Sequence, residues 1–415
     1  MIGLRNLSIH RTLVERLELM VTVFWLLYFM DVKVPPAIPE SIVNSLSYPF
    51  IAALLALHWK QIAYAATRNI PLLIFISVAM FSMVWSADLR ATLDINRGLI
   101  RTFIFGAYFA ACYDLKTQMK ILASVIGIAA VLSLTVSVVI PSYGIGENGW
   151  QGIFPYKNFM GRSMVLGAIL FLILTFDKER QNWLNWIGFY LAILLAVLSQ
   201  SSTSLLLLFV LLSQMPLYSL LKQQYKLRVV LLSLVCIVIG IVLMLIVANQ
   251  EVILVDILGE GTTFNGRTPI WNLIIETVSP ERPWLGYGYG AFWTSDAGVH
   301  VILNTWASDV AIPKSFNAHS VYLEIFANLG MLGVILYGIV FINVYFKSII
   351  LLLSAKTVEL FWMFQFLLFI TLASLADVGL GVSATNAYGV LSIAACMSIS
   401  LEYQRLQKKQ LLTKP

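Results

Sequence analysis

Two residues within one long polar interruption of an apolar chain, Arg267 and His319, have side chains suited to group transfer. Arg267 precedes Thr268-Pro269, a pair that predicts a helix start, where unpaired backbone N–H groups and a neighbouring guanidinium favour phosphate. His319 precedes an apolar run, and the dipole of a following helix would keep its imidazole neutral near pH 7, as a general base requires. Each residue has an ordinary alternative role, as a surface arginine and as a capping or interfacial histidine.

Four charged residues, Arg90, Asp94, Arg97 and Arg101, are spaced 4, 3 and 4 apart and would share one face of a helix. Charges inside a membrane cost several kcal/mol unless they face a partner or a wet cavity. The stripe therefore predicts either a cationic track for an anionic lipid headgroup or a ladder of salt bridges.

The segment 152–162 carries two further cations, Lys157 and Arg162, together with Asn158 and turn-forming glycines. We interpret it as a loop entering a span. Its cations could bind phosphate or sugar, or could extend from the membrane interface into water. His300 is a weaker candidate for chemistry because no helix start follows it.

The elements that must position these side chains are membrane helices. The chain has 415 residues, of which 59% are hydrophobic and 12% charged, and its mean hydropathy is +0.85. A soluble domain carries about twice that charge, and the continuous apolar runs argue against a membrane β-barrel. Three separated cysteines and the absence of a Cys/His cluster argue against a disulfide framework or a zinc site.

Twelve apolar runs approach the ~20 residues that a bilayer-spanning helix needs. Lys and Arg recur in every second loop, which predicts that both termini are cytoplasmic and that the long loop lies outside. We therefore expect an all-α integral membrane protein. The expected spans are residues 17–30, 46–57, 70–85, 94–112, 119–140, 160–176, 183–198, 203–221, 229–249, 321–346, 358–376 and 386–401.

Three segments follow from this pattern: nine spans within 1–250, a large outer loop at 251–320 that carries the candidate site, and three spans with a tail in 321–415. Within the loop, residues 270–278 predict a short helix that begins at Thr268-Pro269 and ends at Ser279-Pro280. The run 283–290, Pro-Trp-Leu-Gly-Tyr-Gly-Tyr-Gly, predicts irregular backbone that packs on protein or lines a wet cavity.

Several motifs, in this order along the chain, resemble those of the O-antigen ligase and polymerase superfamily of bacterial envelope glycosyltransferases. They are Gly266-Arg267-x-x-Ile270-Trp271, the 283–290 run, His319-Ser320-x-Tyr322-Leu323-Glu324 and Asn328-Leu329-Gly330-x-x-Gly333. The segment Gly152-x-Phe154-x-x-Lys157-Asn158-x-x-Gly161 is similar to the exopolysaccharide-polymerase (ExoQ-type) branch. The resemblance covers about residues 145–345 and implies a GT-C-like arrangement of spans around a large periplasmic loop.

The resemblance implies a metal-independent, inverting glycosyltransferase of the bacterial inner membrane that needs no cofactor. The donor would be a glycan on undecaprenyl pyrophosphate, and the acceptor would be lipid A-core in a ligase or a lipid-linked repeat unit in a polymerase. His319 matches the family's proposed base and Arg267 its pyrophosphate-binding arginine. The expected substrate-binding residues are Arg90, Arg97, Arg101, Lys157, Asn158, Arg162, Tyr322 and Glu324.

One departure from the family concerns the serine-rich turn at 199–204, where many members carry a basic residue and this chain has Ser202. Either that donor contact is missing or another cation replaces it, so ligase and polymerase both stay open. The serines themselves are suited to capping two helices. The alternative function is a transporter or flippase of the same polyprenyl-linked glycans, which would need charge and broken helices in both halves of the chain.

Overall fold

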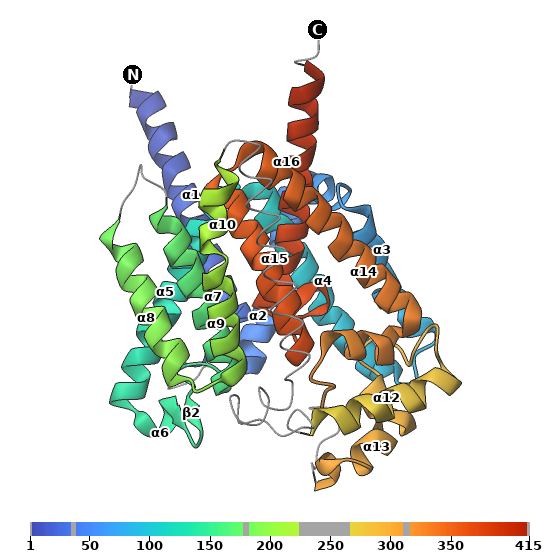
Figure 1. Cartoon of the computed structure of the whole chain (residues 1–415). Coiled ribbons are helices and arrows are strands. Elements are labelled where there is room, and N and C mark those ends of the chain that lie inside the picture. The colour runs from blue at the N-terminus through green and yellow to red at the C-terminus, as the bar shows by residue number, and fades with distance from the viewer. Residues whose placement is uncertain (1, 35–38, 177–181, 224–265, 310–315, 413–415) are drawn as a thin grey trace.

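A computed structural model of the chain describes residues 2–34, 39–176, 182–223, 266–309 and 316–412, and these form an α-helical bundle with a lobe at one end (Figure 1). The bundle helices are α1 (Ile2–Phe29), α2 (Glu40–Ala66), α3 (Ile70–Phe81), α4 (Leu89–Cys112), α5 (Leu115–Val139), α7 (Lys157–Thr175), α8 (Trp183–Leu198), α9 (Ser202–Ser213), α10 (Met215–Leu221), α14 (Val321–Ala355), α15 (Val358–Ala376) and α16 (Ala387–Leu412). The shorter elements are α6 (Pro141–Gly144), α12 (Arg267–Glu281), α13 (Asp296–Leu303), four 3-10 turns (Ser82–Val84, Phe292–Thr294, Trp306–Asp309, Gly381–Ser383) and a hairpin of β1 (Ile145–Gly146) and β2 (Gly149–Trp150) with Ile145 opposite Trp150.

Each predicted span within the described residues coincides with helix, although several helices run further than their apolar core. Six are long and apolar enough to cross a membrane: Ser41–Ala66, Leu115–Val139, Lys157–Thr175, Ser202–Leu221, Val321–Ala355 and Val358–Ala376. These six identify a multi-pass membrane protein, whereas the total of twelve spans stays a prediction. The predicted span 229–249 and the loop residues 251–265 lie outside the described residues.

The bundle core forms around two helices. α7 is the most deeply packed of the six apolar helices, because 78% of its apolar stretch is buried. It contacts α5, α8, α9 and α15. α16 packs against α4, α14 and α15. The serine-rich turn joins α8 to α9 as expected for a cap, because Ser199 ends α8 and the Ser201 hydroxyl accepts from the Ser204 N–H at 3.4 Å.

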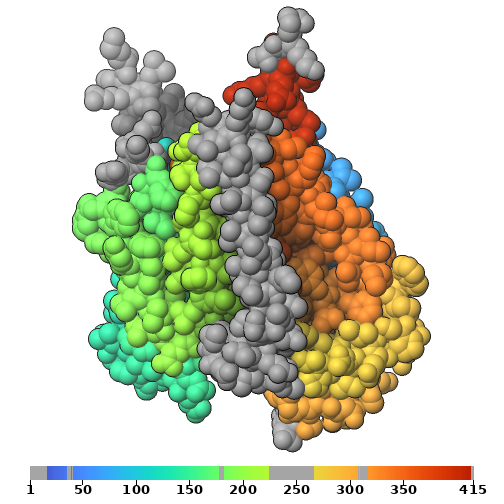
Figure 2. Space-filling model, viewed as in Figure 1, coloured from blue at the N-terminus to red at the C-terminus, as the bar shows by residue number. Residues whose placement is uncertain are grey.

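The lobe has a small apolar core of its own, in which Ile270, Ile274 and Val278 of α12 meet Phe292 and Val301. It lies at the end of the bundle opposite both termini (Figure 1). In Figure 2 the lobe, yellow to orange, is continuous with the orange surface of α14. The segment that carries Arg267 is therefore packed onto the bundle.

The predicted limits of α12 were wrong at both ends. The helix begins at Arg267, with Gly266 as N-cap at a φ of 80°, so Thr268 lies within the first turn and does not cap. It also continues through Pro280 to Glu281. A proline in the last turn removes only one backbone hydrogen bond, and the Val278 carbonyl is still satisfied by the Arg282 N–H at 2.9 Å.

The run 283–290 is irregular, as predicted, and it packs into a break in α14. Gly330 interrupts that helix with a φ of 62° and a ψ of −162°. The carbonyls of Ala327 and Asn328 accept from the loop N–H groups of residues 287 and 288, at 3.1 and 2.8 Å. In return, the N–H groups of residues 331 and 332 donate to loop carbonyls at 2.8 and 3.2 Å. The loop thus satisfies the backbone groups that the helix break leaves unpaired.

Candidate functional site

His319 lies immediately before α14, at the junction of the lobe and the bundle. Its backbone is left-handed, with a φ of 51°, and its N–H donates to the Asn317 Oδ1 at 3.0 Å. Histidine is among the non-glycine residues that accept this conformation more readily. The imidazole is half-buried, and it makes no hydrogen bond or ion pair within the described part of the chain.

Burial is the main cause that lowers the pKa of His319 below its ordinary value of 6.5. The positive charge of Arg267 lowers this pKa further, and the negative charge of Asp377 opposes both effects. The imidazole is therefore neutral at pH 7 and can accept a proton. The same interactions show that Arg267 and Asp377 both lie within electrostatic reach of His319.

Arg267 occupies the first turn of α12, and the following turn fixes its distance from His319. The Trp271 indole, one turn further along the helix, donates to the Ala318 carbonyl at 2.8 Å. The Trp306 indole donates to the Gly266 carbonyl at 3.2 Å and holds the helix start. Across the residues that the structure describes, the half-buried Arg267 side chain has no hydrogen-bond or salt-bridge partner. Its guanidinium, beside the positive end of a helix dipole, is available to an anion.

Glu324 connects the His319 segment to the lobe. Its carboxylate accepts from the Trp293 indole at 2.9 Å, from the Ala318 N–H at 3.0 Å and from the Asn328 amide at 3.1 Å. The Asn328 Oδ1 in turn accepts from the Gly290 N–H at 3.0 Å. Glu324, expected to bind substrate, thus already holds three donors of the protein and positions the residue before His319.

A cavity of about 190 Å³ lies beside this network. Asn317, Glu324 and Asn328 line it on one side, and Ile95 of α4 and Thr385 line it from the bundle. Tyr322, the other expected binding residue of this motif, lies elsewhere. Its hydroxyl donates to the Thr371 carbonyl of α15 at 3.4 Å, and its ring lies against Tyr337, inside the bundle.

Asp377 is the residue of this site that the sequence did not reveal. It ends α15 and pairs with Arg162, whose Nη1 lies 2.5 Å from the Asp377 Oδ2. The Arg162 side chain is 3% exposed, and it also donates to the Asn158 carbonyl at 3.2 Å and to the Tyr156 hydroxyl at 3.3 Å. Arg162 was expected in a loop that enters a span, but it is buried in α7. A carboxylate that ends an apolar run could have signalled a partner of this kind.

Lys157 and Asn158 form the first turn of α7. The Lys157 ammonium donates to the carbonyls of Asn148 and Gln200, at 2.8 and 3.4 Å, and so ties the hairpin to the serine-rich turn. It therefore lies close to Ser202, where the family's basic residue is missing. Asn158 contributes its carbonyl to Arg162.

The stripe on α4 divides into two parts. Arg90 and Arg97 are exposed, and Arg97 pairs with Asp94 at 3.1 Å within the helix. Arg101 instead joins α4 to α1 and α2, because it donates to the side chains of Asn44, Ser47 and Tyr28 and lies over the Tyr48 ring. In the described chain, no hydrogen bond or ion pair links the stripe to Arg267 or His319. The structure thus brings Arg267, His319 and the Arg162–Asp377 pair together and leaves the stripe beside them.

Residues 187–338 match the family model described as O-Antigen ligase (Wzy_C). The match includes α12, the 283–290 loop, His319 and the break in α14. The match covers part of the chain and supports a relationship to the O-antigen ligase and polymerase superfamily, whose members are in general membrane glycosyltransferases of lipid-linked glycans. No curated protein matches this chain.

Proposed function

We propose that this protein transfers a glycan from undecaprenyl pyrophosphate to a sugar hydroxyl without a metal ion, with His319 as the general base. The observation that carries the proposal is a half-buried imidazole of lowered pKa within electrostatic reach of a guanidinium without a described partner and of a carboxylate. The acceptor is lipid A-core if the enzyme is an O-antigen ligase. It is a lipid-linked repeat unit if the enzyme is an O-antigen or exopolysaccharide polymerase.

In the proposed reaction, His319 takes the proton of the acceptor hydroxyl while that oxygen attacks the anomeric carbon of the donor. The new C–O bond forms as the bond to the pyrophosphate breaks, and attack from the opposite face inverts the anomeric configuration. The leaving undecaprenyl pyrophosphate gains negative charge, which Arg267 and the N–H groups at the start of α12 stabilise.

The exposed cations Arg90 and Arg97 would meet the anionic donor on the outer face of α4, the helix that also contributes Ile95 to the cavity. Arg101, Lys157 and Arg162 would act through the helices and turns that they hold together. We place the protein in the bacterial inner membrane, with both termini in the cytoplasm and the lobe in the periplasm, as the distribution of Lys and Arg indicates.

The test is glycan transfer by the purified protein in detergent, with lipid-linked glycan and acceptor supplied together. We expect His319→Gln to lower the rate about 10²- to 10⁴-fold, the range that a general base contributes. His300→Gln is the matched control, because His300 is an exposed histidine in α13 of the same lobe. Full transfer by the His319 variant would remove this residue from the mechanism. Detergent solution has no second compartment, so any product also excludes a protein that only transports the glycan.

A further inference from the structure

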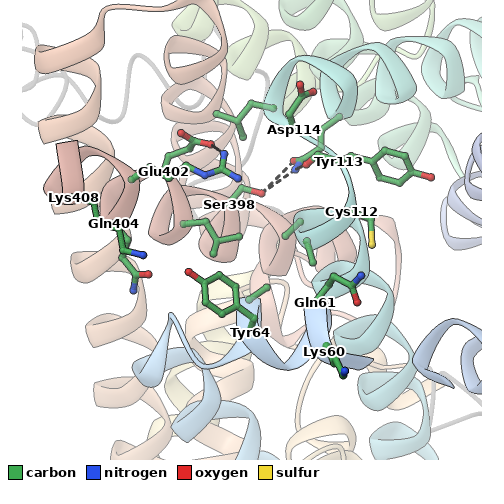
Figure 3. A pocket seen from close by; sticks show the side chains of 17 residues that line it. Lys60, Gln61, Tyr64, Cys112, Tyr113, Asp114, Ser398, Glu402, Gln404 and Lys408 are labelled. Atoms are coloured by element: carbon green, nitrogen blue, oxygen red, sulfur yellow. Dashed lines mark hydrogen bonds and ion pairs between the residues drawn. The ribbon is translucent and has the colours of Figure 1, made fainter. Parts of the chain in front are cut away.

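A second and larger hollow lies at the other end of the bundle, where both termini emerge. It measures about 720 Å³ and is formed by the ends of α2, α4 and α16 and the start of α5. Figure 3 shows Lys60, Gln61 and Tyr64 of α2 on one side of it. Residues of α16, among them Glu402 and Lys408, lie on another side. None of the residues that line it belongs to the proposed glycan site.

The charges around this hollow favour an anion. Two carboxylates are already engaged, because Asp114 caps α5 through the Thr117 N–H at 2.8 Å and Glu402 pairs with Arg405. Lys60 and Lys408 pair with no carboxylate in the part of the chain that is described. The lining thus has two lysines whose charge the protein leaves uncompensated.

Small residues make the space in which such an anion could lie. Ala65 of α2 and Ala110 of α4 are buried, at 0% and 6% exposure, and both line the hollow together with Ala111. Deeper in the wall, the Gln118 amide donates to the Ser398 hydroxyl at 3.0 Å, which Figure 3 draws as a dashed contact. The hollow therefore has polar groups in its wall and small side chains beside the lysines.

The surroundings of α2 favour a lipid over a soluble anion. Only 17% of the apolar stretch of α2 is buried, the lowest share among the six apolar helices, so most of this helix faces outward. Trp59 and Tyr64, 56% and 46% exposed, mark the end of its apolar surface, as aromatic side chains do at a membrane interface. An acyl chain along α2 would bring its headgroup to the level of Lys60.

We propose that this hollow binds the phosphate headgroup of an anionic phospholipid, with Lys60 and Lys408 as its cations and the acyl chains along α2. Basic pockets between the ends of membrane helices are suited to such headgroups. The lipid would occupy the end of the bundle opposite the lobe, so its binding does not depend on the reaction proposed for His319.

Native mass spectrometry of the purified protein, titrated with dioleoyl phosphatidylglycerol or dioleoyl phosphatidylcholine, tests the proposal. We expect preferential binding of phosphatidylglycerol, and an affinity that falls about tenfold or more in the Lys60→Gln/Lys408→Gln double variant. The matched control, Lys222→Gln/Lys356→Gln, removes the same charge from helix ends outside the hollow and should bind as the natural protein does. Equal affinities for the two double variants would overturn the assignment.

A second variant, Ala111→Leu, narrows the hollow and leaves its charges in place, so it should weaken phosphatidylglycerol binding as well. Glycerol 3-phosphate separates the two possible sources of phosphate. Displacement of the lipid by glycerol 3-phosphate at equal concentration would show that the site takes a soluble phosphate, and would overturn the lipid proposal. Thermal unfolding of each variant confirms that the protein is folded.

Discussion

Two arginines near the same histidine show how differently this protein uses positive charge. Arg162 is buried in α7, and its guanidinium contacts Asp377, the Asn158 carbonyl and the Tyr156 hydroxyl. Arg267, at the start of α12, has no such contact among the described residues. A buried arginine that is paired with a carboxylate maintains the fold, whereas an arginine without a partner at a helix start is available for a ligand. The difference separates the structural cations of this chain from its candidate binding cations.

The largest expected effect is the loss of protein stability when the buried Arg162–Asp377 ion pair is broken. Asp377→Ala leaves Arg162 buried without its counter-charge, and we expect the free energy of unfolding to fall by about 3–5 kcal/mol. Arg267→Ala should change it by no more than about 0.5 kcal/mol, because no described partner is lost. Denaturant or thermal unfolding in detergent measures both. The double variant Arg162→Met/Asp377→Leu removes both charges and should recover most of the loss. Equal stabilities of Asp377→Ala and Arg267→Ala would contradict the structural role that we assign to the Arg162–Asp377 pair.

The next effect concerns the backbone hydrogen bonds between the 283–290 loop and the break in α14 at Gly330, which we call the clamp. The clamp holds the lobe on α14 without ion pairs. A Cβ on Gly330 would lie 2.3 Å from the Trp284 backbone, and the φ of this glycine is 62°. We expect Gly330→Ala to destabilise the protein by about 1–3 kcal/mol. It should also weaken glycan transfer, because His319 directly precedes α14, the helix that the clamp joins to the lobe.

Gly338→Ala is the control for the clamp, because a Cβ at Gly338 meets nothing within 4 Å. In the middle of a helix that change should stabilise by about 0.5–1 kcal/mol. Denaturant or thermal unfolding of the two variants in detergent measures the difference in their stability. A Gly330→Ala protein as stable as the Gly338→Ala protein would show that the clamp does not constrain the break.

The smallest effect is a shift in pH dependence, and it tests whether Arg267 acts on His319. The base must be neutral, so a lowered pKa extends activity to lower pH. Arg267→Gln removes a positive charge that lowers the pKa of His319, and this pKa should rise. The acidic limb of the profile of kcat/KM against pH should then move to higher pH. Asp377→Asn removes the charge that raises this pKa and should move the limb the other way. An acidic limb that stays in place in both variants would argue against His319 as the titrating base.

The sequence predicted the positions of the helices because their apolar runs are long and continuous. It did not predict their ends, since α14 and α16 continue as helix well beyond the last residue of each apolar run. The error on Arg162 had the same origin. The glycines and lysine before it indicated a loop, but α7 begins at Lys157 and carries Arg162 into the bundle.

The candidate site was predictable in part. Arg267 and His319 could be proposed from the sequence because each stands beside a helix start that the sequence marks. Asp377 was missed because its partner Arg162 is distant in the sequence, and no local pattern indicates which buried charges will meet. The wrong start of α12 came from Thr268-Pro269, whose signal was overridden by Gly266, a residue that adopts the left-handed N-cap geometry without strain.

The contacts at Gly330 also fix the position of the proposed base relative to the C-terminal part of α14. The lobe donates and accepts hydrogen bonds on both sides of the helix break, so it cannot tilt independently of the span that follows. His319, held through Ala318 and Glu324, therefore keeps a fixed position relative to that span. In the proposed reaction, an acceptor anchored to the membrane would present only those hydroxyls that reach this position. The choice of which hydroxyl is glycosylated would then depend on the distance between the lipid anchor and the sugar.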